Sequence, residues 1–342
     1  MRKKIIFGSI LTLVGIAVII GFSYYQKVFG KAVAQNGSIY IRSSASIEEV
    51  GAILQPYLKS KKDFVWVAKR KKFLKPKAGK YTLQKGMNLN DLVNKLRSGN
   101  QTPIKLSFNN QDTLEKLAQR IATQIEADSS AIFKVMTDST FLVSNGFTSK
   151  SALGMYIPNS YEVYWTITPE KLRKKMLFEY RRFWNQDRIE KAKKLQLNKQ
   201  EVITLASIVQ KETAKREERP IVAGLYINRL QRGIPLQADP TIIYCVKEQK
   251  GQDFIVKRVL NKDLEIQSPY NTYQHRGLPP TLIGMPDISS IDAVLNYKKH
   301  KYLYMCASVT KIGYHEFAKT LSQHNKNSAK YHRWINSQGI NR

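Results

Sequence analysis

One carboxylate, Glu212, closes an otherwise apolar helical pattern and is suited to acid–base chemistry. Val202, Leu205, Ile208 and Val209 recur at helical spacing. Glu212 follows Ile208 by four residues and Leu205 by seven, so 3.6 residues per turn place it on nearly the same face. Burial beside a core disfavours the charged form and raises the pKa of a carboxyl, as a general acid requires near neutral pH. The pattern therefore predicts that Glu212 is the reacting group.

The helix that carries Glu212 has a recognisable start and a less certain end. Asn198 followed three residues later by Glu201 is typical of a capping box, so the helix is predicted over 199–214. If the helix frays before Glu212, that carboxylate is solvated and pairs with Arg216 instead.

The chain is expected to turn sharply after Glu212. Pro220 at a first helical position predicts another helix over 221–230, which stops at Gly233. The charged residues of the connection, 216–219, are predicted to be solvated.

Asp239 is the second carboxylate that suits chemistry. It lies in residues 235–241, which are predicted to be extended or turn-like because the residue before each proline is pushed out of the helical region. Asp239 could orient a water molecule or a sugar hydroxyl, or it could simply form an Asp-Pro turn.

Two later loops are rich in groups that bind sugars. Residues 268–273 and 276–281 combine tyrosines, an asparagine and prolines. Tyrosine rings stack on sugar faces and the amide reads hydroxyls, although each loop alone is an ordinary turn. His315, on a predicted strand, is a further candidate, while a structural role is the commoner use of such a histidine.

The N-terminus predicts a membrane anchor. Ile5–Phe22 is an uncharged run of 18 residues, and extension to Tyr25 gives a length that spans ~30 Å of hydrocarbon. The basic residues before it favour a cytoplasmic N-terminus, and Tyr24 with Tyr25 fits the membrane interface. A cleaved signal peptide is the alternative, with an A-x-A site at 32–34, but its apolar run would be shorter.

Composition limits the classes of protein. The 342 residues suggest about two domains, and 42% hydrophobic residues exclude a disordered chain. A formal charge of +30, spread along the chain, indicates an anionic environment: nucleic acid, lipid headgroups or acidic wall polymers. Cys245 and Cys306 have no metal-binding spacing, so no metal site or cofactor is predicted. The two thiols could pair after export or remain free.

The remaining periodicity predicts alternating short strands and helices. A first α+β unit contains a βα segment at Ala78–Gly99, and a second begins near Ile104 after a linker at 101–103. The predicted strands are 38–41, 81–83, 104–108, 302–305 and 314–317, and the predicted helices are 46–58, 88–99, 113–125, 130–137, 169–194 and a last one from His324.

Several segments, in this order, resemble the signatures of the MltG (YceG-like) family of endolytic murein transglycosylases. They are Ala206–Thr213, Tyr226–Leu230, Leu236–Thr241, Tyr270–Tyr273, Gly277–Pro280 and His315-x-Phe317. The βα segment at Ala78–Gly99 resembles the LysM-like module of that family. The resemblance covers the chain except for most of 125–199.

The resemblance implies a fold class and a division of the chain. We expect an α+β protein with a transmembrane helix, a small LysM-like α+β domain and a larger mixed α+β catalytic domain. The expected parts are a cytoplasmic N-terminus at 1–4, the transmembrane helix at 5–25, a linker at 26–36, the LysM-like domain at 37–101 and the YceG-like catalytic domain at 104–342.

The implied activity is cleavage of the β-1,4 bond between N-acetylmuramic acid and N-acetylglucosamine within glycan strands, leaving 1,6-anhydromuramoyl ends and terminating nascent strands. Glu212 matches the catalytic acid and needs no metal or cofactor. The implied substrate-binding residues are Asn228, Gln237, Asp239, Thr241, Tyr270, Asn271, Tyr273 and His315.

The same resemblance implies where the protein works and with what. The catalytic domain would lie outside the inner (cytoplasmic) membrane, which a single helix crosses. Its partners would be peptidoglycan glycan strands and the membrane, with cell-wall synthases as further candidates. Nucleic acid, supported by charge alone, is excluded by export.

Three positions depart from the family pattern as this sequence stands. Gln210 occupies a position that is commonly Glu, so it cannot donate a proton and Glu212 is left as the acid. Leu153 and Asn159 replace residues that are often acidic, so those roles do not transfer.

Two other functions remain open. A non-catalytic peptidoglycan-binding scaffold would gain nothing from an acid on an apolar face. A hydrolase that uses Asp239 to activate water would differ from the transglycosylase in its reducing-end product.

Overall fold

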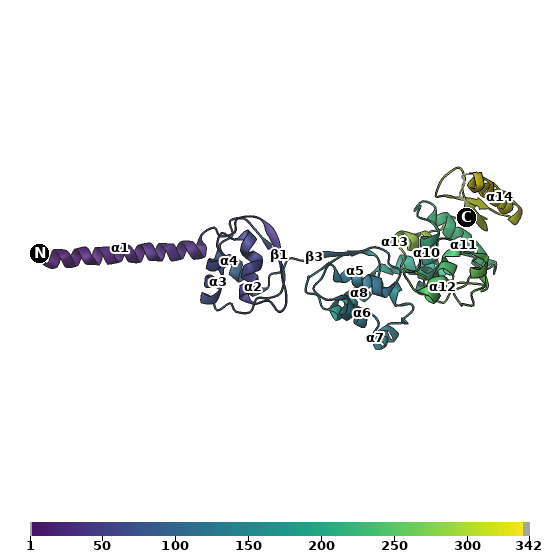
Figure 1. The fold of residues 1–342 in the computed structure, drawn as a ribbon. Helices are drawn as coiled ribbons and strands as arrows, with labels where there is room; N and C mark the ends of the chain where they lie inside the picture. Colours follow the sequence, from purple (N-terminus) through teal and green to yellow (C-terminus); the bar gives the residue numbers. More distant parts are fainter. Residues whose placement is uncertain (1, 338–342) are drawn as a thin grey trace. The chain divides into compact units, whose positions relative to one another are not determined.

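The computed structural model describes residues 2–337, which form helices and three two-stranded sheets (Figure 1). This confirms the mixed α+β class and the apolar N-terminal helix. The α-helices are α1 (Arg2–Phe29), α2 (Ile47–Leu54), α3 (Lys61–Arg70), α4 (Leu89–Ser98), α5 (Leu114–Ala122), α6 (Ser129–Met136), α7 (Ser139–Ser144), α8 (Pro169–Phe183), α9 (Gln186–Lys194), α10 (Lys199–Glu212), α11 (Arg219–Gln231), α12 (Asp239–Lys250), α13 (Ile288–Leu295) and α14 (Leu321–Ser337). The strands are β1 (Gly37–Ile41), β2 (Gly79–Leu83), β3 (Ile104–Phe108), β4 (Asn159–Val163), β5 (Tyr304–Ala307) and β6 (His315–Ala318).

The chain forms two compact units that are not contiguous in sequence. The first runs to Leu106 and also takes in Ala122–Asp128 and Ser160–Thr168; the remainder makes the second. The chain therefore passes between the units more than once, which periodicity alone does not reveal.

The first unit is a small α+β body built by strong local signals. β1 pairs antiparallel with β2, so that Ile39 lies opposite Tyr81. Ser46 and Glu49 form a capping box that starts α2. Asn88 caps the start of α4, and Gly99, with a left-handed φ of 73°, caps its end after Ser98. The inward faces of these elements close one apolar core.

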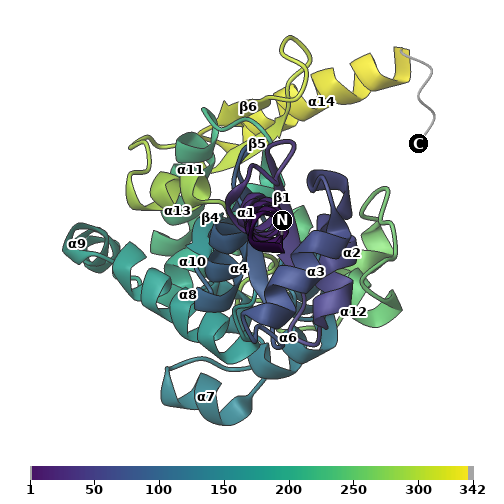
Figure 2. The same ribbon diagram turned by 90° about the vertical axis from the view of Figure 1, so that its left-hand side faces the viewer.

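The N-terminal helix α1 extends from this unit (Figures 1 and 2). Its segment Ile6–Phe29 contains an 18-residue stretch with a mean hydropathy of 2.4 and no buried residue, and it is long and apolar enough to cross a membrane.

The second unit is organised around α10. The predicted capping box of Asn198 and Glu201 is confirmed, and the helix ends at Glu212 instead of at residue 214. From Val202 to Val209 every residue is buried, because α11, α12 and α13 all pack on α10. The sequence predicted one buried face, whereas α10 is buried around most of its circumference.

Several predicted elements differ in their bounds. The helix predicted over 169–194 is two helices, because Asn185 caps a new helix, α9. Residues 235–238 are not helical, but Asp239 begins α12 because Pro240 is well suited to a first turn. The strands predicted at 302–305 and 314–317 begin later, as β5 and β6, and α14 begins earlier, at Leu321.

Candidate active site

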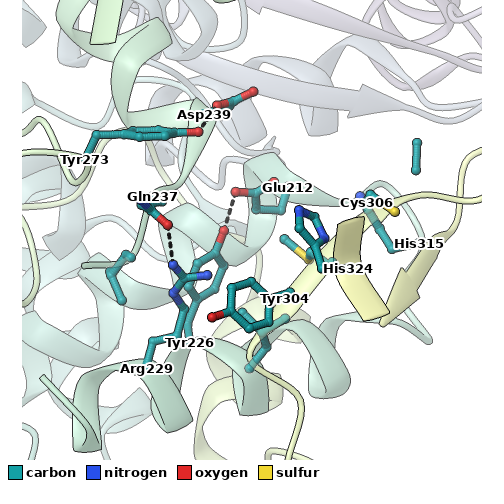
Figure 3. Close-up of a pocket in the computed structure, with 14 residues that line it drawn as sticks. Glu212, Tyr226, Arg229, Gln237, Asp239, Tyr273, Tyr304, Cys306, His315 and His324 are labelled. Carbon is teal, nitrogen blue, oxygen red and sulfur yellow. Dashed lines mark hydrogen bonds between the residues drawn. The ribbon is translucent and has the colours of Figure 1, made fainter. Parts of the chain in front are cut away.

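Glu212 lies in the wall of a cavity of about 370 Å³ in the second unit (Figure 3). The walls come from the end of α10, one face of α11, the start of α12, the β5–β6 hairpin and α14. The lining residues are Glu212, Leu225, Tyr226, Arg229, Leu236, Gln237, Asp239, Tyr273, Tyr304, Met305, Cys306, Ala307, His315 and His324.

Glu212 has the electrostatic properties of a general acid. Its side chain is half-buried at the last residue of α10. Desolvation raises its pKa to about 7, the negative charge of Asp239 adds to the rise, and a hydrogen bond from Tyr226 opposes it. Near neutral pH a large fraction of the carboxyl is therefore protonated and can donate.

Tyr226 on α11 is the direct partner of Glu212. Its hydroxyl donates a hydrogen bond to Glu212 Oε1. Burial, followed by the charge of Glu212, raises the pKa of Tyr226 well above 10, so the phenol keeps its proton. The sequence analysis did not assign Tyr226 a role.

Arg229, one turn further along α11, fastens the loop beside the acid. Its Nη2 donates to Gln237 Oε1 at 2.5 Å and its Nε donates to the carbonyl of Pro235 at 2.9 Å. Gln237 has a φ of 51°, in the left-handed region that few side chains favour. Arg229 and the Thr272 carbonyl, which accepts from Gln237 N at 3.0 Å, hold this conformation at the edge of the cavity.

Asp239 and Tyr273 form a second polar pair in the cavity wall. Tyr273 Oη donates to Asp239 Oδ1 at 2.6 Å. Asp239 is exposed, whereas Glu212 is half-buried.

His315 on β6 is oriented by a buried carboxylate. Glu218 Oε2 lies 3.0 Å from His315 Nδ1, and Glu218 Oε1 accepts from His315 N at 2.8 Å. Thr213 Oγ1, directly after the acid, donates to Glu218 Oε2 at 3.0 Å. Glu218 thus ties β6 to the segment that follows Glu212.

The burial of Glu218 corrects a prediction. Residues 216–219 were expected to be solvated, but Glu218 and Arg219 are only 4% and 3% exposed. Arg219 donates to Ser289 Oγ at 2.6 Å and pairs with Asp287 at 3.3 Å. Both side chains are buried because each has partners from distant segments, which the local sequence does not show.

The hairpin and α14 supply cavity residues that sequence reasoning missed. His324 stacks on Tyr304 with ring centroids 5.4 Å apart, and burial lowers the pKa of His324. Cys306 lies beside them; it and Cys245 are free thiols, each with a pKa raised by burial. These residues were hidden because no local pattern shows which face of a short strand lines a cavity.

Four of the predicted substrate-binding residues do not line the cavity. The Asn228 amide donates to the carbonyls of His300 and Tyr302 at 2.8 and 3.0 Å. Asn271 is buried and donates to the carbonyls of Leu264 and Ile266, both at 2.9 Å. These two amides brace the backbone.

Thr241 and Tyr270, the other two of these four residues, also bond within the protein and not in the cavity. The buried hydroxyl of Thr241 bonds Ala238 O at 2.7 Å and lies 2.8 Å from Thr272 Oγ1. Tyr270 is 3% exposed, and its hydroxyl lies 2.6 Å from Thr281 Oγ1. The structure therefore brings Gln237, Asp239, Tyr273 and His315 to Glu212, but not these four side chains.

Gln210, two residues before Glu212, has a structural role here. Its Oε1 accepts from Ser290 Oγ at 2.7 Å and from Asp287 N at 3.2 Å, at the start of α13. Gln210 does not line the cavity.

Comparison with known proteins identifies the family. Residues 39–330 match the YceG-like family. The chain belongs to the YceG-like family. It is 31% identical over 312 residues to a Bacillus subtilis protein named endolytic murein transglycosylase, a match that covers 86% of this chain and 84% of that protein.

Two other YceG-like relatives agree with this assignment. An endolytic murein transglycosylase of Streptococcus pneumoniae D39 is 29% identical over 324 residues, covering 86% of this chain but 58% of that longer protein. A crystal structure of a YceG-like protein from Listeria monocytogenes aligns with a TM-score of 0.58 at 29% identity, covering 85% of this chain and 98% of that one.

Proposed function

We propose that this protein is an endolytic peptidoglycan transglycosylase, a lyase, in which Glu212 alone provides acid and base catalysis. The observation that carries the proposal is a carboxyl group with a pKa of about 7 in the wall of a polar cavity. The names of the Bacillus and Streptococcus relatives support murein as the substrate.

The contact with Tyr226 determines which oxygen of protonated Glu212 carries the proton. Because Tyr226 donates to Oε1, that atom acts as the carbonyl oxygen and the acidic proton belongs on Oε2. Oε2 is then the atom that donates to the substrate. Tyr226 also limits rotation of the carboxyl.

The proposed reaction needs no water. Glu212 Oε2 gives its proton to the glycosidic oxygen that leaves C1 of N-acetylmuramic acid. The C6 hydroxyl oxygen of the same sugar forms the new bond to C1, and its proton returns to the Glu212 carboxylate. The products are a strand with a 1,6-anhydromuramoyl end and a strand that begins with a free 4-hydroxyl, and the enzyme is restored.

The polar residues around Glu212 are proposed to hold the sugar chain. Gln237, Asp239 and Tyr273 would contact one side of the scissile bond. His315, which Glu218 orients, would contact the other. Asn228, Thr241, Tyr270 and Asn271 are proposed to act indirectly, by fixing the backbone that carries these groups.

The remaining proposals concern location. α1 would anchor the protein in the inner membrane as a single pass, with the N-terminus in the cytoplasm and both units outside. The first unit would be LysM-like, and cleavage near the membrane would terminate nascent strands beside cell-wall synthases.

Analysis of product ends tests the proposal. Purified full chain is incubated with uncrosslinked glycan strands, and the fragments are analysed by mass spectrometry. Internal fragments that end in 1,6-anhydromuramic acid are expected. Reducing ends would indicate a hydrolase that uses Asp239, and the absence of fragments with retained binding would indicate a scaffold; either result would refute the proposal.

A further inference from the structure

The outer end of α1 is fastened to α3 within the first unit. Tyr24, just past the apolar run, stacks on Trp66 with ring centroids 5.4 Å apart and an interplanar angle of 26°. Lys27 pairs with Asp63 at 2.8 Å and lies 5.1 Å from the centre of the Trp66 ring. α3 therefore lies beside the end of the apolar part of α1, as Figure 1 also shows.

The segment that follows Trp66 in the chain is strongly basic. Residues 69–80 contain seven Lys or Arg and no Asp or Glu. Some of these side chains are used internally: Lys71 donates to Asn90 and Asn94, and Lys69 pairs with Glu48.

Other cations of α3 and of the segment after it are exposed. In the part of the chain that the structure describes, Lys62, Lys72 and Lys75 enter no ion pair and point to solvent. Leu74 is 63% exposed between Lys72 and Lys75. Arg70 lies 5.2 Å from the centre of the Trp66 ring, so cations also surround the aromatic pair.

We propose that Lys62, Arg70, Lys72, Leu74 and Lys75 form a membrane-surface patch that binds anionic phospholipid headgroups of the bilayer that α1 crosses. Cations attract the phosphates, while Leu74 and the Tyr24–Trp66 pair suit the boundary between headgroups and acyl chains. The proposal rests on the membrane anchorage proposed above.

Lipid fits this patch better than an acidic wall polymer does. A soluble polymer would be attracted by the charges but offers nothing to an exposed leucine or to an interfacial tyrosine–tryptophan stack. The patch also adjoins the end of the anchor. Because the anchor tethers the patch to the bilayer, the local concentration of headgroups there is high.

Amide hydrogen exchange of the full chain in lipid nanodiscs tests the proposal. Discs contain phosphatidylcholine alone or with a minority of phosphatidylglycerol. Amide exchange within residues 62–77 is expected to slow by about fivefold in discs with the anionic lipid, because one basic residue near an anionic surface gains binding affinity of about that factor. The slowing should disappear at high salt.

Matched variants separate the patch from general charge. The triple variant K62Q/K72Q/K75Q should lose the slowing, whereas K257Q/R258Q/K262Q, which removes three exposed cations from the second unit, should keep it. Equal exchange in both kinds of disc, equal loss in both variants, or slowing by wall polymer but not by lipid would overturn the proposal. Failure of the chain to enter discs at all would refute the anchorage as well.

Discussion

At the scale of single residues, the balance of effects on Glu212 decides whether the site can act as an acid. Desolvation is the largest effect and raises its pKa; the hydrogen bond from Tyr226 lowers it, and Asp239 raises it again. The result, about 7, leaves the group able both to donate and to accept a proton near neutrality.

Tyr226→Phe should move the pH profile of the reaction. The hydrogen bond from Tyr226 lowers the pKa of Glu212, so its loss raises that pKa further. Because the protonated acid is required, the alkaline limb of kcat/KM should shift upward by about one pH unit. Tyr244→Phe, on α12 outside the cavity, is the control. An unchanged limb would show that Tyr226 does not govern the acid.

Glu212→Gln should stabilise the protein at alkaline pH. The pKa of Glu212 is raised from 4.5 to about 7 on folding, so the wild type binds the proton more tightly when folded and loses stability as pH rises between these values. Above pH 7 this cost is about 3 kcal/mol, which the neutral amide avoids. Denaturant unfolding of both proteins at acid and alkaline pH measures it. A stability difference that is independent of pH would contradict the assigned pKa.

At the scale of elements, α11 divides its side chains between two tasks. Tyr226 and Arg229, three residues apart, share the face that meets the cavity, while Asn228 points to the segment around His300. On the same helix, a Cβ on Gly224 would lie 2.5 Å from the carbonyl oxygen of Lys298. Only glycine permits this approach, which seats α11 and thereby aims Tyr226 at the acid.

Asn228→Ala should damage stability and leave substrate affinity intact. Its amide donates hydrogen bonds to two backbone carbonyls. The loss of both hydrogen bonds should lower the free energy of unfolding by about 2 kcal/mol. KM should stay unchanged in conditions where the variant is folded. Gln231→Ala, on the exposed side of α11, is the matched control. A large rise in KM with normal stability would restore the substrate-binding role expected from sequence.

What the sequence predicts about these elements depends on whether the signal is local. Helical spacing, with the capping box of Asn198 and Glu201, was enough to find α10 and its acid. The burial of Glu218 depends on His315, about 100 residues away. The orientation of α11 depends on the bond from Asn228 to Tyr302, about 70 residues away. No periodicity encodes those contacts. The resemblance to the family implied substrate binding for Asn228, Thr241, Tyr270 and Asn271, and it carried no information on their bonds within the protein.

At the scale of the whole molecule, the apolar helix and the positive charge bear on where the reaction takes place. The apolar segment Ile6–Phe29 is suited to hold the chain in a membrane. The formal charge of +30 suits both lipid headgroups and an anionic wall. The sequence alone predicts both properties, since they are sums over residues and do not depend on packing.

Deletion of residues 2–22 should release the protein from membranes. The deletion removes most of the apolar run but retains Tyr24 and Lys27, which pack on the first unit. The shortened chain should fractionate as a soluble protein at high salt and still cleave dissolved glycan strands. Persistent membrane association at high salt would show that α1 is not the principal anchor.

The central claim is that Glu212 alone performs the proton transfers. Glycan strands are treated with the wild type, with Glu212→Gln and with Glu190→Gln, an exposed carboxylate on α9, and anhydro ends are counted by mass spectrometry. The account predicts normal yields from the wild type and Glu190→Gln, and a loss of about a thousandfold or more from a folded Glu212→Gln. Anhydro ends at an undiminished rate from folded Glu212→Gln would contradict it.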